Sequence, residues 1–473
     1  MTLSSRFPIN TIAASGRRVL LCGLLLMPAG GSADSLRLPE FQKRQLKNGL
    51  TLLLMEQHEV PVVSFHVLIK AGSTADPPGK AGLASITVGL LRKGTSHRTA
   101  DQISAELDFV GGELATAAEP DFSWISSEFL KKDLNEGLSL LSDVLRSPDF
   151  PEEEVRKLVA RRIDEIKAAK DEALGVIGDY FNAFLYGAHP YGRPVEGDER
   201  SLRGLNREDV VAFYKGFYSP GNTVLVACGD FETQAIEEQL KAQLLSWSDR
   251  PVTPVEIPLP SRVSGRRLLL IDKPDATQTY FQFGNLGVSR THPDRTAVQL
   301  INTLLGGRFT SLLNTELRIN SGLTYGARST FSLRREAGPF SIFSFTRTET
   351  TEKALDLALE VLGRLHFQGV SQEQLDSGRE YLKGQFPLSL ETSDQLAGLL
   401  ARLEFYGLEA AEVNGFYRRL NAVTLADARR VIKEHLPLSD LAYVLIGRAE
   451  SIQKAAVKYA LEIKRKAITE EGF

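Results

Sequence analysis

The 473-residue sequence has little cysteine, no long apolar run and no excess of positive charge. Beyond its first segment, no stretch reaches the about 18 consecutive apolar residues that a membrane-spanning helix needs, so no stable membrane span is predicted. Its 56 Lys+Arg and 59 Asp+Glu give a formal charge of −3 without a basic block, which makes nucleic acid an improbable partner. A hydrophobic content of 42% instead predicts two to four globular domains.

Histidine pairs at metal-binding spacing are also missing. No two of the seven histidines stand three to five residues apart, so no helix can present two imidazoles on one face to a zinc ion. The chain contains no Gly-x-Ser-x-Gly sequence either, which argues against a serine hydrolase of the α/β type. The seven positions are His58, His66, His97, His189, His292, His366 and His435.

The amino-terminal segment resembles a secretory signal peptide. Arg17 and Arg18 precede the apolar run Val19–Met27, and small residues follow up to a predicted cleavage site after Ala33. Cleavage of residues 1–33 removes three arginines and no acid, which takes the formal charge from −3 to −6. The mature chain keeps Cys228 as its single thiol, which excludes an intramolecular disulfide and a cysteine metal site. We expect a periplasmic or secreted protein.

The remaining sequence has an α+β pattern whose elements recur. Strand-like and helical stretches alternate up to residue 246, residues 247–262 are rich in proline, and a similar order of elements follows from 263 to 473. Leu205-Asn206 recurs as Leu420-Asn421, and the segment ending in Cys228-Gly229 recurs as Ile446-Gly447. We expect two homologous lobes, 34–246 and 263–473, each a mostly antiparallel sheet covered by helices, joined by a linker into a half-clamshell.

Several spaced motifs carry a family resemblance that extends over nearly the whole mature chain. Together they resemble the M16 family of metallopeptidases, which includes pitrilysin, insulinase and the mitochondrial processing peptidases. The motifs are Gly82-Leu83-Ala84, Leu90-Leu91-Arg92-Lys93-Gly94-Thr95, His189-Pro190-Tyr191-Gly192-Arg193-Pro194, Tyr218-Ser219-Pro220-Gly221-Asn222, Leu305-Gly306-Gly307-Arg308-Phe309, and Leu317-Arg318 through Gly322-Leu323-Thr324-Tyr325-Gly326.

The resemblance implies a degenerate zinc motif in the first lobe. Active family members carry His-x-x-Glu-His after the Gly-Leu-Ala step, with two histidine ligands and a glutamate as general base. The corresponding positions here are Ser85, Val88 and Gly89, so both histidines and the base are missing. Glu165 matches the distant third ligand, and Ala115 stands where the family usually has an asparagine that orients the substrate. One carboxylate without imidazoles is not expected to hold zinc.

The second lobe retains a different part of the family pattern. Arg318 and Tyr325, seven residues apart, match the arginine and tyrosine with which the family contacts the substrate. A guanidinium offers a rigid fork of donors to peptide carbonyls, and a phenol can donate to an oxygen that gains negative charge. An arginine at a helix end and a tyrosine in a turn are also common without any such role, and the surrounding motif favours the functional interpretation.

Two further segments have both a functional and a structural interpretation. By analogy with the family, Phe122–Phe129 would form the strand to which an extended peptide adds, although most of its side chains are expected in the sheet core. Gly306-Gly307 would permit a close backbone approach or a mobile loop, or would simply end a helix.

The resemblance therefore predicts a secreted, zinc-free subunit that pairs with a zinc-bearing homologue as a heterodimer. Such a chain would need no cofactor of its own, would enclose peptide substrates, and would donate Arg318 and Tyr325 to hydrolysis at the partner's zinc. An alternative is a pseudo-peptidase that only binds peptides or scaffolds a complex of the cell envelope. A third interpretation, an autonomous peptidase with substituted ligands, would require stoichiometric zinc and chelator-sensitive cleavage by the single chain.

Overall fold

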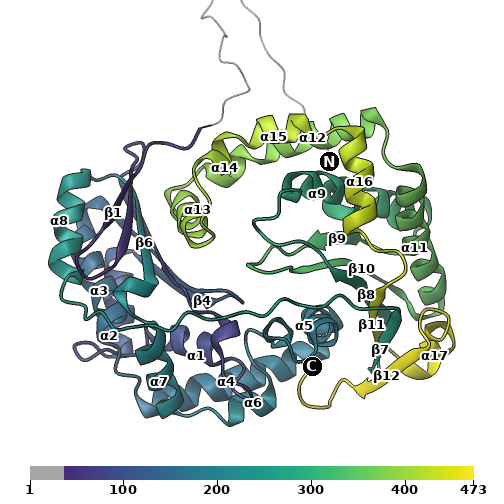
Figure 1. Ribbon diagram of the computed structural model, residues 1–473. Coiled ribbons are helices and arrows are strands. Elements are labelled where there is room, and N and C mark those ends of the chain that lie inside the picture. The colour runs from purple at the N-terminus through teal and green to yellow at the C-terminus, as the bar shows by residue number, and fades with distance from the viewer. Residues whose placement is uncertain (1–36) are drawn as a thin grey trace, which may run out of the picture. The chain divides into compact units, whose positions relative to one another are not determined.

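The computed structural model describes residues 37–473, which fold around two six-stranded sheets (Figure 1). The predicted signal peptide, residues 1–33, lies outside the described residues. Among the residues that are described, no helix has the length and apolarity needed to cross a membrane.

The first sheet has the strand order β1-β2-β6-β3-β5-β4. Only β2 and β6 run parallel, and the other pairs are antiparallel. Side chains alternate between its faces, so that Leu52 and Leu54 pack under helices on one side while Leu53 and Met55 face the other. The strands are β1 (Gln42–Gln45), β2 (Thr51–Glu56), β3 (Val62–Ile69), β4 (Glu113–Ala118), β5 (Ser123–Leu130) and β6 (Thr223–Gly229).

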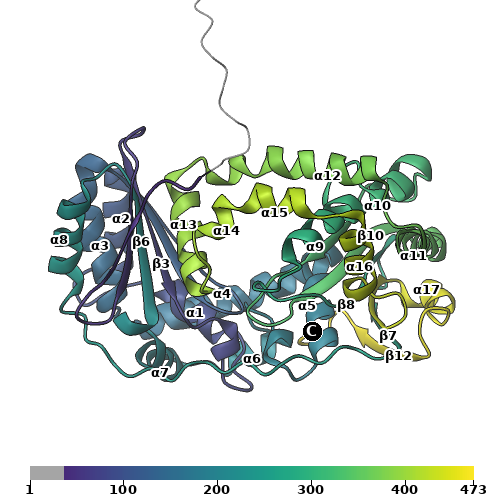
Figure 2. The ribbon, with the colours of Figure 1, turned by 45° about the horizontal axis from the view of Figure 1, so that its top comes forward.

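Helices from the first half of the chain cover one face of this sheet (Figure 2). Several begin with a side chain that caps the free backbone N–H groups, such as Thr99 before α2 and Asn206 before α7. The helices of this half are α1 (Leu83–Leu90), α2 (Ala100–Val110), α3 (Leu134–Arg146), α4 (Glu152–Asp171), α5 (Ala173–Tyr186), α6 (Glu199–Arg203), α7 (Arg207–Phe217) and α8 (Thr233–Leu244).

The second sheet has the order β12-β7-β11-β8-β10-β9 and so repeats the first. In the first sheet β2 pairs in parallel with β6, which is antiparallel to β3. In the second sheet β7 pairs in parallel with β11, which is antiparallel to β8. The sheets differ at one edge, where β1 is antiparallel to β2 but β12 is parallel to β7. The strands are β7 (Arg266–Asp272), β8 (Gln278–Leu286), β9 (Ala327–Phe331), β10 (Pro339–Arg347), β11 (Leu441–Gly447) and β12 (Glu462–Ala467).

The expected fold class is therefore confirmed: two related, mostly antiparallel sheets are each covered by helices. No helix or strand occurs within residues 247–262, the segment predicted as a linker. The helices that follow β8 are α9 (Arg295–Asn302), α10 (Leu312–Asn314), α11 (Thr351–Gln368), α12 (Gln372–Gln385), α13 (Ser393–Phe405), α14 (Ala411–Asn414), α15 (Phe416–Ala422), α16 (Leu425–His435) and α17 (Ala449–Ala456).

The two halves exchange one helix each. Helix α13, from the second half, packs on β3 and β6 and buries the second face of the first sheet, as Figures 1 and 2 both show. Helix α5, from the first half, packs on β8 and β11 and buries the second face of the second sheet. Each sheet therefore needs the other half of the chain to complete its core, which joins the halves through apolar contact rather than through the linker alone.

The expectation that Phe122–Phe129 offers an edge for peptide addition is wrong. Strand β5 pairs with β3 on one side and β4 on the other, so its backbone groups are already used. The free edge on this side of the sheet is β4, in which Ala115 is exposed. Alternation identifies a strand but says nothing of its place in the sheet, which is why the sequence did not separate β5 from β4.

Candidate functional site

The helix with the predicted degenerate motif, α1, begins at a tightly built corner. The buried carboxylate of Asp76 accepts hydrogen bonds from the backbone N–H groups of Gly82 and Ala84, both at 2.8 Å. Gly82 has a φ of 92° and lies against the backbone of Gly197, so a side chain there would be strained and would collide. Burial raises the pKa of Asp76 to about 8, against the opposing effect of these hydrogen bonds.

Polar groups near the predicted metal position are paired with one another. The Ser85 hydroxyl donates to Oε2 of Glu196 at 2.6 Å, and Nη1 of Arg162 lies 2.5 Å from the same oxygen. Nε of Arg162 lies 3.6 Å from Oε2 of Glu165, which is exposed and also pairs with Arg161 at 3.4 Å. A guanidinium thus bridges the predicted third ligand to the partner of Ser85.

The other two motif positions provide no ligand. The side chain of Val88 is 1% exposed and belongs to the hydrophobic core of the first half. A Cβ atom at Gly89 would lie 3.3 Å from Cδ2 of Leu158, so a larger residue would have to displace that leucine. Zinc requires several nitrogen, sulfur or carboxylate ligands directed at one point. A hydroxyl, a valine, a glycine and an arginine-paired glutamate do not fit a zinc ion.

Arg318 and Tyr325 lie together at the second predicted site. The guanidinium carbon of Arg318 is 4.4 Å from the ring centroid of Tyr325 and 4.8 Å from that of Phe309, so it contacts two aromatic rings. Tyr325 is 75% and Phe309 59% exposed. Among residues 37–473, Arg318 has no carboxylate or side-chain hydrogen-bond partner. Cation–π contacts use the face of the guanidinium, so its N–H donors are left for a ligand.

Surrounding hydrogen bonds fix the segment that carries Tyr325. The backbone N–H of Ala327 donates to Oδ1 of Asn314 at 2.9 Å, which ties the segment to α10. The hydroxyl of Thr324 lies 3.0 Å from the carbonyl oxygen of Gly326, and Ser344 on β10 donates to both of these groups. The tyrosine is therefore presented by a braced turn, as a preorganised binding group requires.

The backbone around Arg318 departs from regular α-helix. Two segments are π-helical, Thr303–Gly307 before Phe309 and Thr315–Asn320 after it, and the second contains Arg318. Such π-turns are rare and occur frequently at functional sites. Both interpretations of Gly306-Gly307 are observed: the helical segment ends at Gly307, and a Cβ atom at Gly306 would lie 2.2 Å from the backbone nitrogen of Ser329. The sequence placed Phe309 in the same motif as the two glycines but indicated no role for it.

The structure also joins polar residues whose separation in the sequence concealed them. His292, Asp294 and His435 bring possible metal-ligand atoms within 4.8 Å of one another. The carboxylate of Asp294 is already held by both terminal nitrogens of Arg430, at 2.6 and 2.7 Å, and by Nε2 of His435 at 3.0 Å. Nδ1 of His292 accepts the backbone N–H of Asp294. These contacts connect α9 to α16, and both oxygens of the Asp294 carboxylate take part in this structural link.

Cys228, the one thiol in the described residues, is buried in strand β6. Burial raises the pKa of this thiol to about 12. The thiolate is therefore scarce at neutral pH, and the side chain acts as a core residue.

Two family models match successive parts of the chain. The family model described as "Insulinase (Peptidase family M16)" matches residues 51–199, and "Peptidase M16 inactive domain" matches residues 204–382. Among curated relatives, a protein named uncharacterized zinc protease from Streptomyces coelicolor is 26% identical over 84% of this chain and 87% of its own length. A probable mitochondrial-processing peptidase subunit beta from Arabidopsis thaliana is 23% identical over 88% of this chain and 80% of its own.

Solved structures show the same architecture. A peptidase M16 inactive domain from Pseudomonas fluorescens superposes with a TM-score of 0.81 and 26% identity, over 86% of this chain and 98% of that one. A protease from Helicobacter pylori gives a TM-score of 0.80 at 22% identity, over 86% of this chain and all of that one. The ordered motifs, the two family matches and the repeated sheets lead to one conclusion: the chain belongs to the peptidase M16 family.

Proposed function

We propose that this protein is the zinc-free subunit of an exported two-chain M16 peptidase. It pairs with a zinc-bearing homologue and contributes Arg318 and Tyr325 to the hydrolysis of extended peptides. The observation that carries this proposal is the state of Arg318, whose guanidinium is held between two exposed rings and has no carboxylate partner in the described chain. Its N–H donors have no partner in the described chain and are therefore available to the carbonyl oxygens of a peptide.

The two side chains suit complementary parts of peptide cleavage. The planar fork of Arg318 can donate to two carbonyl oxygens of an extended peptide and so fix its position. The hydroxyl of Tyr325 can donate to the carbonyl oxygen that gains negative charge during attack. The partner's zinc would supply the polarised nucleophile, which the paired residues around Ser85 do not support here. The isolated chain should therefore not cleave peptides.

The test requires the assembled complex. A homologue with the His-x-x-Glu-His motif, sought first in an adjacent reading frame, is co-purified with this chain, and its zinc content and peptide turnover are measured. Tyr325→Phe should reduce kcat by about 100-fold, the typical effect of removing one donor to a developing oxyanion. Arg318→Ala should reduce kcat/KM by tenfold or more, through the loss of charged hydrogen bonds of about 1.5–3 kcal/mol. Assembly and zinc content should be unchanged.

Arg347→Ala provides a matched control, because Arg347 is an exposed arginine of the same half that pairs with Glu349. It should leave turnover unchanged. Full activity of both site variants in a zinc-containing complex would reject the catalytic role.

The second candidate is a peptide-binding or scaffolding subunit without a part in catalysis. The exposure of Phe309 and Tyr325 favours it, because aromatic rings and arginine are common contact residues at protein interfaces. In that case Arg318→Ala would weaken peptide binding or assembly, and the turnover of the peptide that still binds would not change. The two candidates therefore differ in whether kcat responds.

A further inference from the structure

Two adjoining cavities lie between the first sheet, helix α13 and the loops that follow β8 and β9. Their volumes are about 560 and 200 Å³, and both are lined by Arg290, Leu333 and Arg402. The larger cavity also contacts His66 and Trp124 of the first sheet, and the smaller one reaches the apolar side chains of α13 and α15. The exchanged helix α13 is thus the wall that both cavities share.

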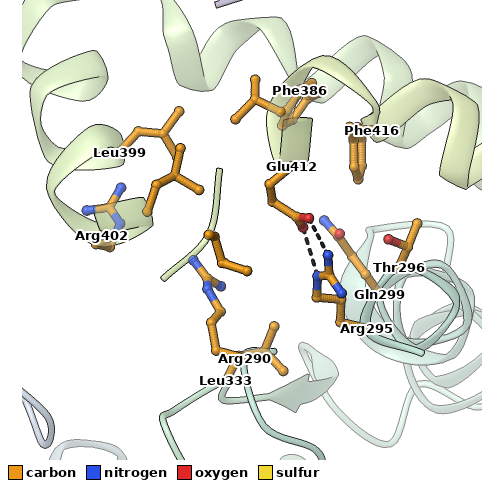
Figure 3. A pocket seen from close by; sticks show the side chains of 13 residues that line it. Arg290, Arg295, Thr296, Gln299, Leu333, Phe386, Leu399, Arg402, Glu412 and Phe416 are labelled. Atoms are coloured by element: carbon orange, nitrogen blue, oxygen red, sulfur yellow. Dashed lines mark hydrogen bonds and ion pairs between the residues drawn. The ribbon is translucent and has the colours of Figure 1, made fainter. Parts of the chain in front are cut away.

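The arginines of the smaller cavity differ in their partners. Nε of Arg295 donates to the Glu412 carboxylate at 2.8 Å, and a second nitrogen of Arg295 contacts the other oxygen. Arg290 and Arg402 have no carboxylate within ion-pair distance and no side-chain hydrogen bond among the described residues. Figure 3 shows these two side chains arriving from separate elements, while the pair of Arg295 and Glu412 closes on itself. Only two of the three guanidiniums are therefore open to a ligand.

The acidic groups of the larger cavity make no direct ion pair with Arg290 or Arg402 among the described residues. Asp121 accepts hydrogen bonds from the hydroxyls of Tyr191 and Tyr406 and from the backbone N–H of Arg335. Asp394 accepts the Ser126 hydroxyl at 2.5 Å and pairs with His66 at 3.4 Å.

Glu119, the third acid, is exposed. Desolvation by the surrounding cavity wall still raises the pKa of its carboxyl, and the attraction of Arg334 and Arg402 opposes this shift. Arg334, the other cation of the wall, stacks on Tyr191 at 4.7 Å. None of the three acids therefore donates to, accepts from or ion-pairs with Arg290 or Arg402 among the described residues.

The charged form of Arg402 is destabilised by its surroundings. Burial lowers the pKa of its guanidinium, and the positive charge of Arg290 lowers it further. Glu119 and Asp394 oppose this effect from a distance, but neither forms an ion pair with Arg402 among the described residues. An arginine stays charged, so two cations share the wall without a directly paired carboxylate. A bound anion would relieve both the desolvation and the repulsion.

Helix α13 leaves space beside Arg402 through a glycine. A Cβ atom on Gly398 would lie 3.1 Å from Nε2 of His66 and 3.3 Å from Nη1 of Arg402. The absence of that atom lets the arginine and the histidine approach the same point. Substitution by alanine would narrow this part of the cavity without changing its charge.

Apart from Thr296 and Gln299, the uncharged lining of the smaller cavity is apolar. Its lining includes Phe386, Leu399, Leu403 and Phe416. A small inorganic anion would leave this surface without contact, whereas an organic acid would cover it while its charged group meets the guanidiniums. We propose that the cavities bind a carboxylate attached to an aliphatic or aromatic body, such as the carboxy-terminal residue of a peptide. This site is separate from Arg318 and Tyr325, and its test does not depend on the proposed function.

Isothermal titration of the full mature chain, without any partner, tests this site. The probes are N-acetyl-Phe-Leu as the free acid, the same dipeptide as its amide, octanoate and inorganic phosphate. The free acid should bind at least tenfold more tightly than the amide, because only the acid makes charged hydrogen bonds. Stronger binding of the dipeptide acid than of octanoate identifies a peptide end, and the reverse order identifies a free organic acid. Equal binding of acid and amide, or phosphate binding as tight as either acid, would overturn the proposal.

Substitutions test whether the free acid binds at these residues. Arg290→Gln and Arg402→Gln should each weaken binding of the free acid about tenfold or more, and Gly398→Ala should weaken it without loss of charge. Arg328→Gln is the control, because Arg328 stacks on the ring of Phe343, as Arg290 does on that of Tyr406, but lies outside the cavities. If Arg402→Gln does not fold, Arg402→Lys keeps the charge without the forked geometry and should still lose affinity. Unchanged affinity in folded Arg290→Gln and Gly398→Ala proteins would reject the site.

Discussion

The two halves of this chain share a strand order but treat their polar groups in opposite ways. Around α1 in the first half, Ser85, Glu196, Arg162 and Glu165 are linked to one another by a hydrogen bond and ion pairs. In the second half, Arg318 is fixed by ring contacts and its donors have no internal partner. A polar cluster that closes on itself stabilises a fold, whereas a restrained group with free donors is able to bind a ligand. This difference, more than the repeated architecture, is the reason that the proposed site lies in the second half.

The largest effect is expected when the predicted general base is restored in the first half. Val88→Glu would place a carboxylate in a side-chain environment that is 1% exposed, and we expect a loss of about 3 kcal/mol or more in the free energy of unfolding. Urea unfolding at pH 7 measures it. Val88→Gln is the matched control, because it adds a similar volume without the charge and should lose less.

Acidification should sharpen this comparison of the two variants. The gap between Val88→Glu and Val88→Gln should narrow as the pH falls and the buried carboxylate takes up a proton. A loss below about 1 kcal/mol for Val88→Glu would mean that the position opens to water, which would contradict the closed description of the first half.

A smaller effect is expected from substitution of Asp179 on α5, whose carboxylate is repelled by Glu196 of the same cluster. Burial, with a contribution from the negative charge of Glu196, raises the pKa of Asp179 to about 6. The folded state therefore holds this proton more tightly than the unfolded state, whose pKa is about 3.9. The protonated carboxyl therefore gives its full contribution to the free energy of unfolding below about pH 4, and this contribution is lost as the pH rises to about 6.

Asp179→Asn should remove that slope and stabilise the protein at pH 7 by about 1–2 kcal/mol. Unfolding free energies at pH 4, 5, 6 and 7 measure the change. Asp164→Asn, at an exposed carboxylate of α4, should keep the slope of the parent protein. An Asp179→Asn protein with the parent slope would show that this carboxyl is ionised throughout the range.

The sequence predicted the repeat and the chemistry-bearing motifs, but not the contacts between distant segments. Apolar alternation and the recurring Leu-Asn and glycine positions predicted two related sheets, which the structure confirms. An apolar helix face shows that a helix is buried but not against which sheet, so the exchange of α5 and α13 was not foreseen. The seven-residue spacing of Arg318 and Tyr325 was visible in the sequence. The pairing of Ser85 with Glu196, 111 residues away, was not.

The smallest effect is expected from substitution of Phe309, which tests whether its ring positions Arg318 or itself contacts the peptide. Its ring lies 4.8 Å from the guanidinium carbon of Arg318, on a side chain that is 59% exposed. An exposed cation–π contact is worth about 0.5–1 kcal/mol, so Phe309→Ala should weaken the action of Arg318 by about two- to fivefold. In the complex with a zinc-bearing homologue we expect a higher KM for peptides with little change in kcat, because Phe309 acts through Arg318. Phe309→Tyr restores a ring and should restore KM, whereas Phe309→Leu keeps the apolar volume but not the ring and should not. If leucine restores KM as fully as tyrosine, the contact is ordinary packing, and the restraint of Arg318 rests on Tyr325 alone.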